Sequence, residues 1–270
     1  PAARWLTVET NVSLPIPANN ANDLFVDTFN RPNATDIDAS AVGMWGSRVP
    51  PLGQNAADYE GFEGSGSATS IEVVNNTLRM AVGAGMSENG IEHNFVGQDI
   101  IDAGGFSVSL TVQNISTSSS DAANRYVGFG VGLSQAEAAT GADINNTPAA
   151  GAVAFRGSTT GNTGAAAFFV ELDLNGNVKV WHDGALLDTV SVGQNYGTLT
   201  ASFACAGFTT NDTVTVTVFF NGQLVDINTA DPNSVSRTFK WDRNNSNYLG
   251  LSARASNYTQ MDNLAIRKLP

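Results

Sequence analysis

The sequence has few of the side chains that carry most enzyme chemistry. Among 270 residues there are one cysteine and two histidines, so a disulfide within the chain is excluded and imidazole for proton transfer or metal binding is scarce. Cys205 lies in an apolar run, where a buried structural thiol is much more common than a nucleophile. These shortages favour a protein without catalytic activity.

Basic residues and long hydrophobic runs are also missing. Lys and Arg number 13 against 25 Asp and Glu, which gives a formal net charge of −12. A surface of this sign repels phosphate backbones, so nucleic acid is not an expected partner. No apolar run is long enough to span a bilayer. Abundant Gly, Ala, Asn, Ser and Thr with little Lys predict a secreted, extracellular or cell-surface protein, whose export signal was removed before Pro1.

What the sequence does have is the pattern of β-hairpins. Residues 168–192 alternate apolar and polar side chains around two turn sequences, Asn175-Gly176 and Asp183-Gly184. Asn-Gly and Asp-Gly accept positive φ in two-residue type I′ turns, so this stretch predicts a three-stranded antiparallel meander. The same pattern recurs at 71–82 and 214–227.

Shorter alternating stretches complete the predicted fold. Further strands are expected at 23–30, 99–112, 125–133, 149–156, 248–255 and 261–268. Gln135 to Ala142 is the one stretch that favours a helix, and 83–97 is expected to be irregular. About 12 to 14 short, regularly spaced strands predict an all-β fold, a two-sheet antiparallel β-sandwich or jelly roll.

The first 22 residues stand apart from this pattern. The even positions from 6 to 16 are apolar except for Thr10, and the odd positions from 7 to 13 are polar, which predicts one extended, half-buried strand; a loose tether follows it. The apolar face consists of Leu6, Val8, Val12, Leu14 and Ile16. We therefore divide the chain into an N-terminal strand and tether at 1–22 and a sandwich at 23–270. The strand either pairs within its own chain or completes the sheet of a neighbouring copy.

Three stretches carry a resemblance to a known superfamily. They are Phe25 to Pro32, Ile71 to Met80 and Met261 to Arg267. They resemble the first strand, the first hairpin and the last strand of the concanavalin A-like jelly rolls, which include laminin-G-like domains, legume lectins and family 16 glycoside hydrolases. The resemblance covers 23–270 and extends to secreted bacterial surface proteins of this fold.

The resemblance implies one structural Ca²⁺. Its ligands would be the Asp262 carboxylate, a backbone carbonyl at or near Asp27, and a carbonyl of Gly61 or Gly64. Oxygen-only ligation of this kind suits calcium. The alternative is that Asp262 caps the end of a strand.

The resemblance also suggests two sites that the residues match only in part. Family 16 hydrolases carry Glu-x-Asp-x-Glu on one strand, but here Glu171 and Asp173 are followed by Asn175, so the acid/base is missing. The metal loop of legume lectins is matched by Glu171, Asp173 and Asn177, but its next two positions fall on His182 and Leu187. We predict no catalytic residues; His93, as the base of a lyase, is the remaining alternative.

Sugar binding requires only an exposed aromatic ring and a few hydrogen bonds. Trp181, Trp241, Tyr248 and Asn245 are the candidates, and burial in the core is the alternative for the tryptophans. We therefore rank first a non-catalytic extracellular structural or adhesive protein that self-assembles through residues 6–16. A carbohydrate-binding module or lectin for extracellular glycans ranks second, and a polysaccharide hydrolase or lyase third.

Overall fold

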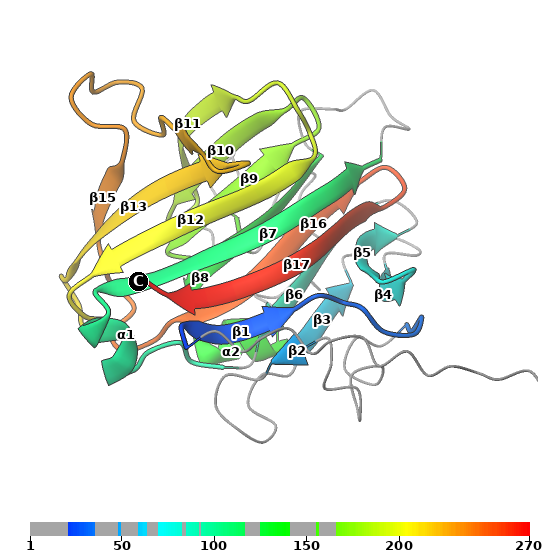
Figure 1. Cartoon of the computed structure of the whole chain (residues 1–270), viewed down its shortest axis with the longest axis horizontal. Helices are drawn as coiled ribbons and strands as arrows, with labels where there is room; N and C mark the ends of the chain where they lie inside the picture. Colours follow the sequence, from blue (N-terminus) through cyan, green and yellow to red (C-terminus); the bar gives the residue numbers. More distant parts are fainter. Residues whose placement is uncertain are drawn as a thin grey trace, which may run out of the picture.

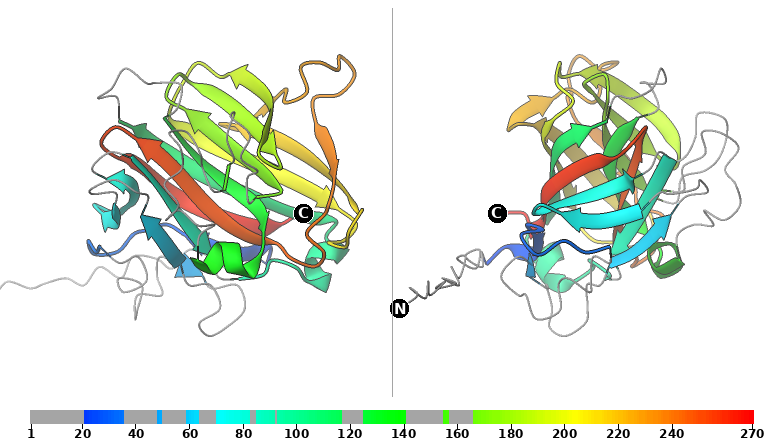
Figure 2. Two further views of the ribbon diagram at one scale, coloured as in Figure 1. Left: turned by 180° about the vertical axis from the view of Figure 1, so that it is seen from behind. Right: turned by 90° about the vertical axis from the view of Figure 1, so that its right-hand side faces the viewer.

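The computed structural model describes residues 21–35, 48–49, 59–63, 70–82, 85–91, 93–116, 125–140, 155–156 and 166–270. Its strands form two antiparallel sheets, one with ten strands and one with seven, stacked as a sandwich (Figure 1). The edge-on view in Figure 2 shows the sheets as separate layers. The predicted all-β, two-sheet antiparallel fold is confirmed.

The ten-stranded sheet contains the first and last described strands. Its main order is β14-β13-β12-β7-β17-β1-β2, with β15 beside β13 and the β4–β5 hairpin beside β17. The bounds are β1 Asp23–Asp27, β2 Arg48–Val49, β4 Ser70–Val74, β5 Thr77–Val82, β7 Gly105–Ile115, β12 Gly197–Cys205, β13 Thr213–Phe220, β14 Gln223–Val225, β15 Arg237–Lys240 and β17 Thr259–Lys268.

The seven-stranded sheet has the order β11-β10-β9-β8-β16-β6-β3. Its bounds are β3 Tyr59–Glu63, β6 Gly85–Ile91, β8 Tyr126–Leu133, β9 Phe168–Asp173, β10 Asn177–His182, β11 Ala185–Ser191 and β16 Tyr248–Ala255. The predicted meander at 168–192 is thus confirmed as β9, β10 and β11.

The hairpin turns follow their sequences with one exception. Both turn residues have positive φ at Asp183-Gly184, Asn221-Gly222 and Asn75-Asn76, as type I′ requires. At Asn175-Gly176 only the glycine does, so the predicted type I′ turn is wrong there. The physical reason is Asp173, whose Oδ1 accepts a hydrogen bond from the backbone N–H of Asn175 (2.9 Å) and so shapes a longer loop.

Two short helices frame the sandwich. Helix α2, Gln135–Thr140, confirms the predicted helix. It begins with a capping box, because Glu137 N–H bonds to the Ser134 hydroxyl (3.2 Å) and Ser134 N–H bonds to the Glu137 carboxylate (2.7 Å). Helix α1, Gln98–Asp102, was not predicted, and the strand expected at 99–112 begins only at Gly105.

The sheets enclose an apolar core, and Cys205 belongs to it. Burial raises the pKa of its thiol to about 11, with a smaller contribution from the charge of Asp212, which agrees with a structural role. Residues 83–97 were expected to be irregular, but Gly85–Ile91 within this stretch form β6. Within the described part of the chain, no helix is both long and apolar enough to cross a membrane. The predicted strand at 6–16 lies outside the described residues.

Candidate functional site

The outer face of the seven-stranded sheet, turned away from the ten-stranded sheet, carries charged side chains that are fully buried. On β9, Phe168, Val170 and Leu172 belong to the core cluster, so the alternate residues Glu171 and Asp173 point to the opposite face. Both carboxylates are at most 1% exposed. Buried carboxylates require partners, because burial disfavours their charge.

Arg156 and Lys179 supply those partners. The Arg156 guanidinium donates to both Glu171 oxygens, at 3.2 and 3.0 Å. Lys179 Nζ lies 2.8 Å from Asp173 Oδ2 and 3.7 Å from Glu171 Oε1. Tyr126 and Trp181 complete the group, with ring centres 4.2 and 4.7 Å from the guanidinium carbon of Arg156. We call these six residues and Glu88 the outer-face cluster.

Glu88 lies on β6, in one cross-strand row with Ser252, Gly128 and Glu171. Its Oε1 accepts the backbone N–H of Phe155 at 2.9 Å. Burial raises the pKa of Glu88 to about 7, although Phe155, Ser252 and the charge of Arg156 act in the opposite direction.

Three buried polar atoms of the cluster have no hydrogen-bond partner among the residues that the structure describes: Glu88 Oε2, Arg156 Nε and Trp181 Nε1. A small polar molecule in contact with these atoms would satisfy them.

The chemistry of Glu171 and Asp173 is constrained by these contacts. Burial raises the pKa of Glu171, while Arg156 and Lys179 lower it. Asp173 accepts hydrogen bonds from the backbone N–H groups of Asn175 and Asn177, both at 2.9 Å, and from the Asn177 side chain. Asn175, which stands where family 16 hydrolases have their acid/base, is exposed in the turn. The two carboxylates therefore hold the β9–β10 hairpin in place.

A second candidate site lies where the two sheets open at one side. A groove of about 350 Å³ lies between β11 with its following residues and the β13–β14 hairpin. Its apolar lining consists of Val190, Val192, Phe220, Leu224 and Val225. The polar lining consists of Ser191, Gln194, Asn221, Gln223 and Asp226. We call this the edge groove.

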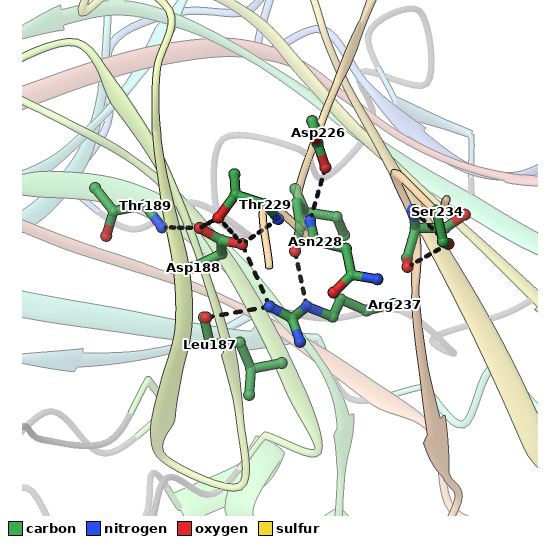
Figure 3. A network of polar contacts seen from close by, with 10 residues as sticks. Leu187, Asp188, Thr189, Asp226, Asn228, Thr229, Ser234 and Arg237 are labelled. Carbon is green, nitrogen blue, oxygen red and sulfur yellow. Dashed lines mark hydrogen bonds and ion pairs between the residues drawn. The ribbon is translucent and has the colours of Figure 1, made fainter. Parts of the chain in front are cut away.

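A polar network beside the groove joins the two sheets (Figure 3). Asp188 of β11 accepts hydrogen bonds from the Thr229 backbone N–H (2.9 Å) and hydroxyl (3.0 Å), and from Arg237 (3.3 Å). Arg237 also donates to the carbonyls of Ile227 (2.8 Å) and Leu187 (3.3 Å). Burial alone would raise the pKa of Asp188, but the hydrogen bonds from Thr229, Thr189 and Arg237 outweigh it and lower that pKa.

The residues predicted to bind sugar are not gathered on one exposed face. Trp181 and Trp241 are only 2% and 1% exposed, so the alternative of core packing holds for both. Tyr248 is half-buried and packs against the group that contains Trp181, whereas Asn245 is exposed in the loop before β16. An exposed aromatic platform made of these residues is therefore wrong.

The structure describes three of the residues predicted to hold calcium, whereas Gly64, the alternative to Gly61, lies outside the described residues. Asp27 is fully buried, and Arg31 Nη1 lies 2.7 Å from its Oδ1, so a guanidinium neutralises its carboxylate; the ligand predicted at this position is its backbone carbonyl. Gly61 belongs to the seven-stranded sheet, whereas Asp27 and Asp262 belong to the ten-stranded one. Burial, together with the charge of Asp27, raises the pKa of Asp262 to about 6.

The two histidines are separate from these sites. His93 is half-buried and packs edge-on against Phe95, with ring centres 4.7 Å apart. His182 ends β10 and lies 3.6 Å from the Asp183 carboxylate and against Phe239.

Sequence reasoning missed Glu88, Arg156, Asp188 and Arg237. For Asp188 and its partner Arg237 one signal was available, because the charged Asp188 stands among apolar residues of β11. Arg156 had no such signal, because its contacts are made with strands distant in the sequence.

Comparison with known proteins bears on the fold of the chain and not on its function. No family model matches the chain, and no curated protein matches it. Among solved structures, peanut lectin is similar with 13% identity, a TM-score of 0.44, and coverage of 78% of this chain and 97% of the lectin. A Lotus tetragonolobus seed lectin has 11% identity, a TM-score of 0.43, and coverage of 81% and 96%.

A Bacillus subtilis protein of unknown function with a galectin-like fold has 8% identity, a TM-score of 0.43, and coverage of 78% and 89%. The two-sheet antiparallel sandwich expected from the sequence is confirmed by the strand order of the chain itself, and the concanavalin A-like resemblance stays a prediction. At these identities the likeness says nothing of a ligand.

Proposed function

We propose that the protein is a non-catalytic structural or adhesive protein of the cell surface or extracellular matrix. Copies of it assemble when residues 6–16 of one chain add a strand to the next. The observation that carries this proposal is the position of the exposed large hydrophobic side chains. Those of the described residues are Leu186, Tyr196, Leu224 and Val235, and all lie between β11 and β15. Exposed apolar side chains in this segment offer surface that association with another chain would cover.

One further observation supports a non-catalytic role. The carboxylates Glu171 and Asp173 of the outer-face cluster are neutralised by Arg156 and Lys179 rather than free for proton transfer. The outer-face cluster therefore serves stability before it serves any chemistry.

The test is the state of association of the full chain. Sedimentation and electron microscopy over a range of concentrations should show dimers growing into fibres. The double variant Val8→Asp/Val12→Asp, on the apolar face of the predicted strand, should stay monomeric. The matched control Thr7→Asp/Asn11→Asp alters the opposite face and should assemble as the wild type does. A wild-type chain that remains a monomer at high concentration would refute the proposal.

A further inference from the structure

We infer that the acceptor for the donated strand is the edge groove between β11 and β14, and that its occupant is residues 6–16 of a second copy. This inference rests on the proposed self-assembly and adds the site at which it occurs. It concerns a surface that none of the predicted site residues occupies.

Both walls of the groove are sheet edges. β11 is the last strand of the seven-stranded sheet, and β14 is the last strand on the main path of the ten-stranded sheet. The outer side of an edge strand presents backbone N–H and C=O groups that can pair with an added strand. Pairing of this kind gives affinity, and pockets for alternate side chains give specificity.

The groove matches the chemistry of the predicted strand. Its floor is apolar and includes Val190, Phe220 and Val225, while polar residues such as Gln194 and Gln223 form the rest of its lining. Residues 6–16 offer the complementary pattern, with apolar side chains at the even positions except Thr10, and with Thr7, Glu9, Asn11 and Ser13 between them. β11 has 7 residues, fewer than the 11 of the strand, so the strand is long enough to run beside the part of β11 that Arg237 and Thr229 do not contact.

The rim of the groove exposes apolar surface that an added strand would cover. Leu224 lines the groove and is 51% exposed, although its neighbour Val225 is only 5% exposed. Covering apolar area of this kind is the main favourable contribution to association.

The two walls are already fixed relative to one another. Asp188, Thr229 and Arg237 connect β11 to the segment between β14 and β15 (Figure 3). The Asp226 carboxylate, which lines the groove, also accepts the backbone N–H of Asn228 at 3.0 Å. A preorganised acceptor loses little conformational entropy when the strand binds.

The donor must come from another copy because the tether is short. Asp23 starts β1, which lies five strands from β14 in the ten-stranded sheet, at the opposite side of Figure 1 from β11. A strand added outside β14 would lie six strand spacings from β1, which amount to about 28 to 29 Å. The seven Cα–Cα steps from Ile16 to Asp23 span at most about 23 to 25 Å when fully extended. The strand of one chain therefore does not reach the groove of the same chain, and insertion joins two copies head to tail.

The experiment is a complementation of two variants of the full chain. Leu224→Lys impairs the groove and leaves the strand intact, whereas Val8→Asp/Val12→Asp impairs the strand and leaves the groove intact. Each variant alone should associate at least tenfold more weakly than the wild type. Their mixture should form a one-to-one dimer, because one intact strand meets one intact groove. Gln135→Lys is the matched control, since it adds the same charge at an exposed position of helix α2 that does not line the groove.

The outcomes separate this inference from the proposed function. If the strand variant is monomeric while Leu224→Lys and Leu224→Glu both assemble as the wild type does, the acceptor lies elsewhere and only this inference falls. If the strand variant also assembles normally, the proposed function falls with it. Circular dichroism of each variant verifies folding. Using Lys and Glu at the same position ensures that a shared loss of assembly reflects the lost apolar contact rather than the sign of the charge.

Discussion

The outer-face cluster lies on the seven-stranded sheet, whereas the edge groove lies between an edge of that sheet and an edge of the ten-stranded sheet, and the two regions differ in how their side chains are satisfied. The cluster buries Glu171, Asp173, Arg156 and Lys179 and satisfies them mostly with each other. The edge groove instead leaves apolar side chains such as Leu224 exposed. A buried charge must be satisfied within the folded chain, whereas an exposed apolar edge can await a partner. The cluster therefore determines whether the chain folds, and the groove determines whether copies associate.

Removal of Arg156 should give the largest loss of folding stability. A small loss would contradict the difference drawn between the cluster and the groove. Arg156→Ala leaves Glu171 buried without its main partner, so the free energy of unfolding should fall by about 3 to 5 kcal/mol. Urea unfolding at pH 7 measures it. Arg243→Ala is the control, since Arg243 and its partner Asp183 are 26% and 41% exposed, and it should cost less than about 1 kcal/mol. Equal losses in the two variants would mean that the cluster is not satisfied from within.

Glu88 should make the cluster sensitive to pH. Its pKa is raised from 4.5 to about 7 by burial, so the folded chain keeps a proton that the unfolded chain releases. This contribution to stability is complete below pH 4.5 and is lost as the pH rises toward 7. Glu88→Gln, which is always neutral, should therefore be more stable than the wild type by up to about 3 kcal/mol at pH 8 and similar to it at pH 4.5. A constant difference across this range would contradict the buried carboxyl.

Asp188 should have an intermediate effect on the free energy of unfolding. It lies beside the edge groove, but its carboxylate is paired within the chain, as the carboxylates of the outer-face cluster are. Asp188→Asn weakens its bonds to Thr229 and Arg237 and should cost about 1 to 2 kcal/mol at pH 7. The pKa of Asp188 is lowered from 3.8, so this stabilisation is present above that value and disappears as the pH falls through the folded-state pKa. Thermal unfolding from pH 7 to pH 2 measures both effects. Asp183→Asn, at a side chain 41% exposed, serves as the control.

Leu224 should have the smallest effect on folding. Because it is 51% exposed, Leu224→Lys should change the free energy of unfolding by no more than about 0.5 kcal/mol, even though assembly is weakened. Comparing the unfolding of this variant with that of the wild type sharpens the separation between the two regions. A large loss of stability would show that Leu224 belongs to the core.

Much of the fold was predictable because its signals are local. The alternation in β9, β10 and β11 and the turns at Asp183-Gly184 and Asn221-Gly222 are readable from neighbouring residues. Helix α1 and strand β6 were not predicted, because long-range pairing decides them. The pairing of β6 with β16, for instance, joins Glu88 to Ser252.

The sites were less predictable than the fold for the same reason. Trp181 and Trp241 resemble a sugar platform in the sequence, but both are buried. Glu171 and Asp173 were noticed, yet their partner Arg156 comes from a segment without a motif.

The sequence by itself determined a two-layer β-sandwich and a separate apolar alternation at 6–16, since periodicity and turn residues act over a few positions. Only the tertiary structure decided which carboxylates are neutralised and where the sheets leave an apolar edge. Those properties depend on pairs such as Asp188 and Arg237, 49 residues apart, which are brought together only when the two sheets stack.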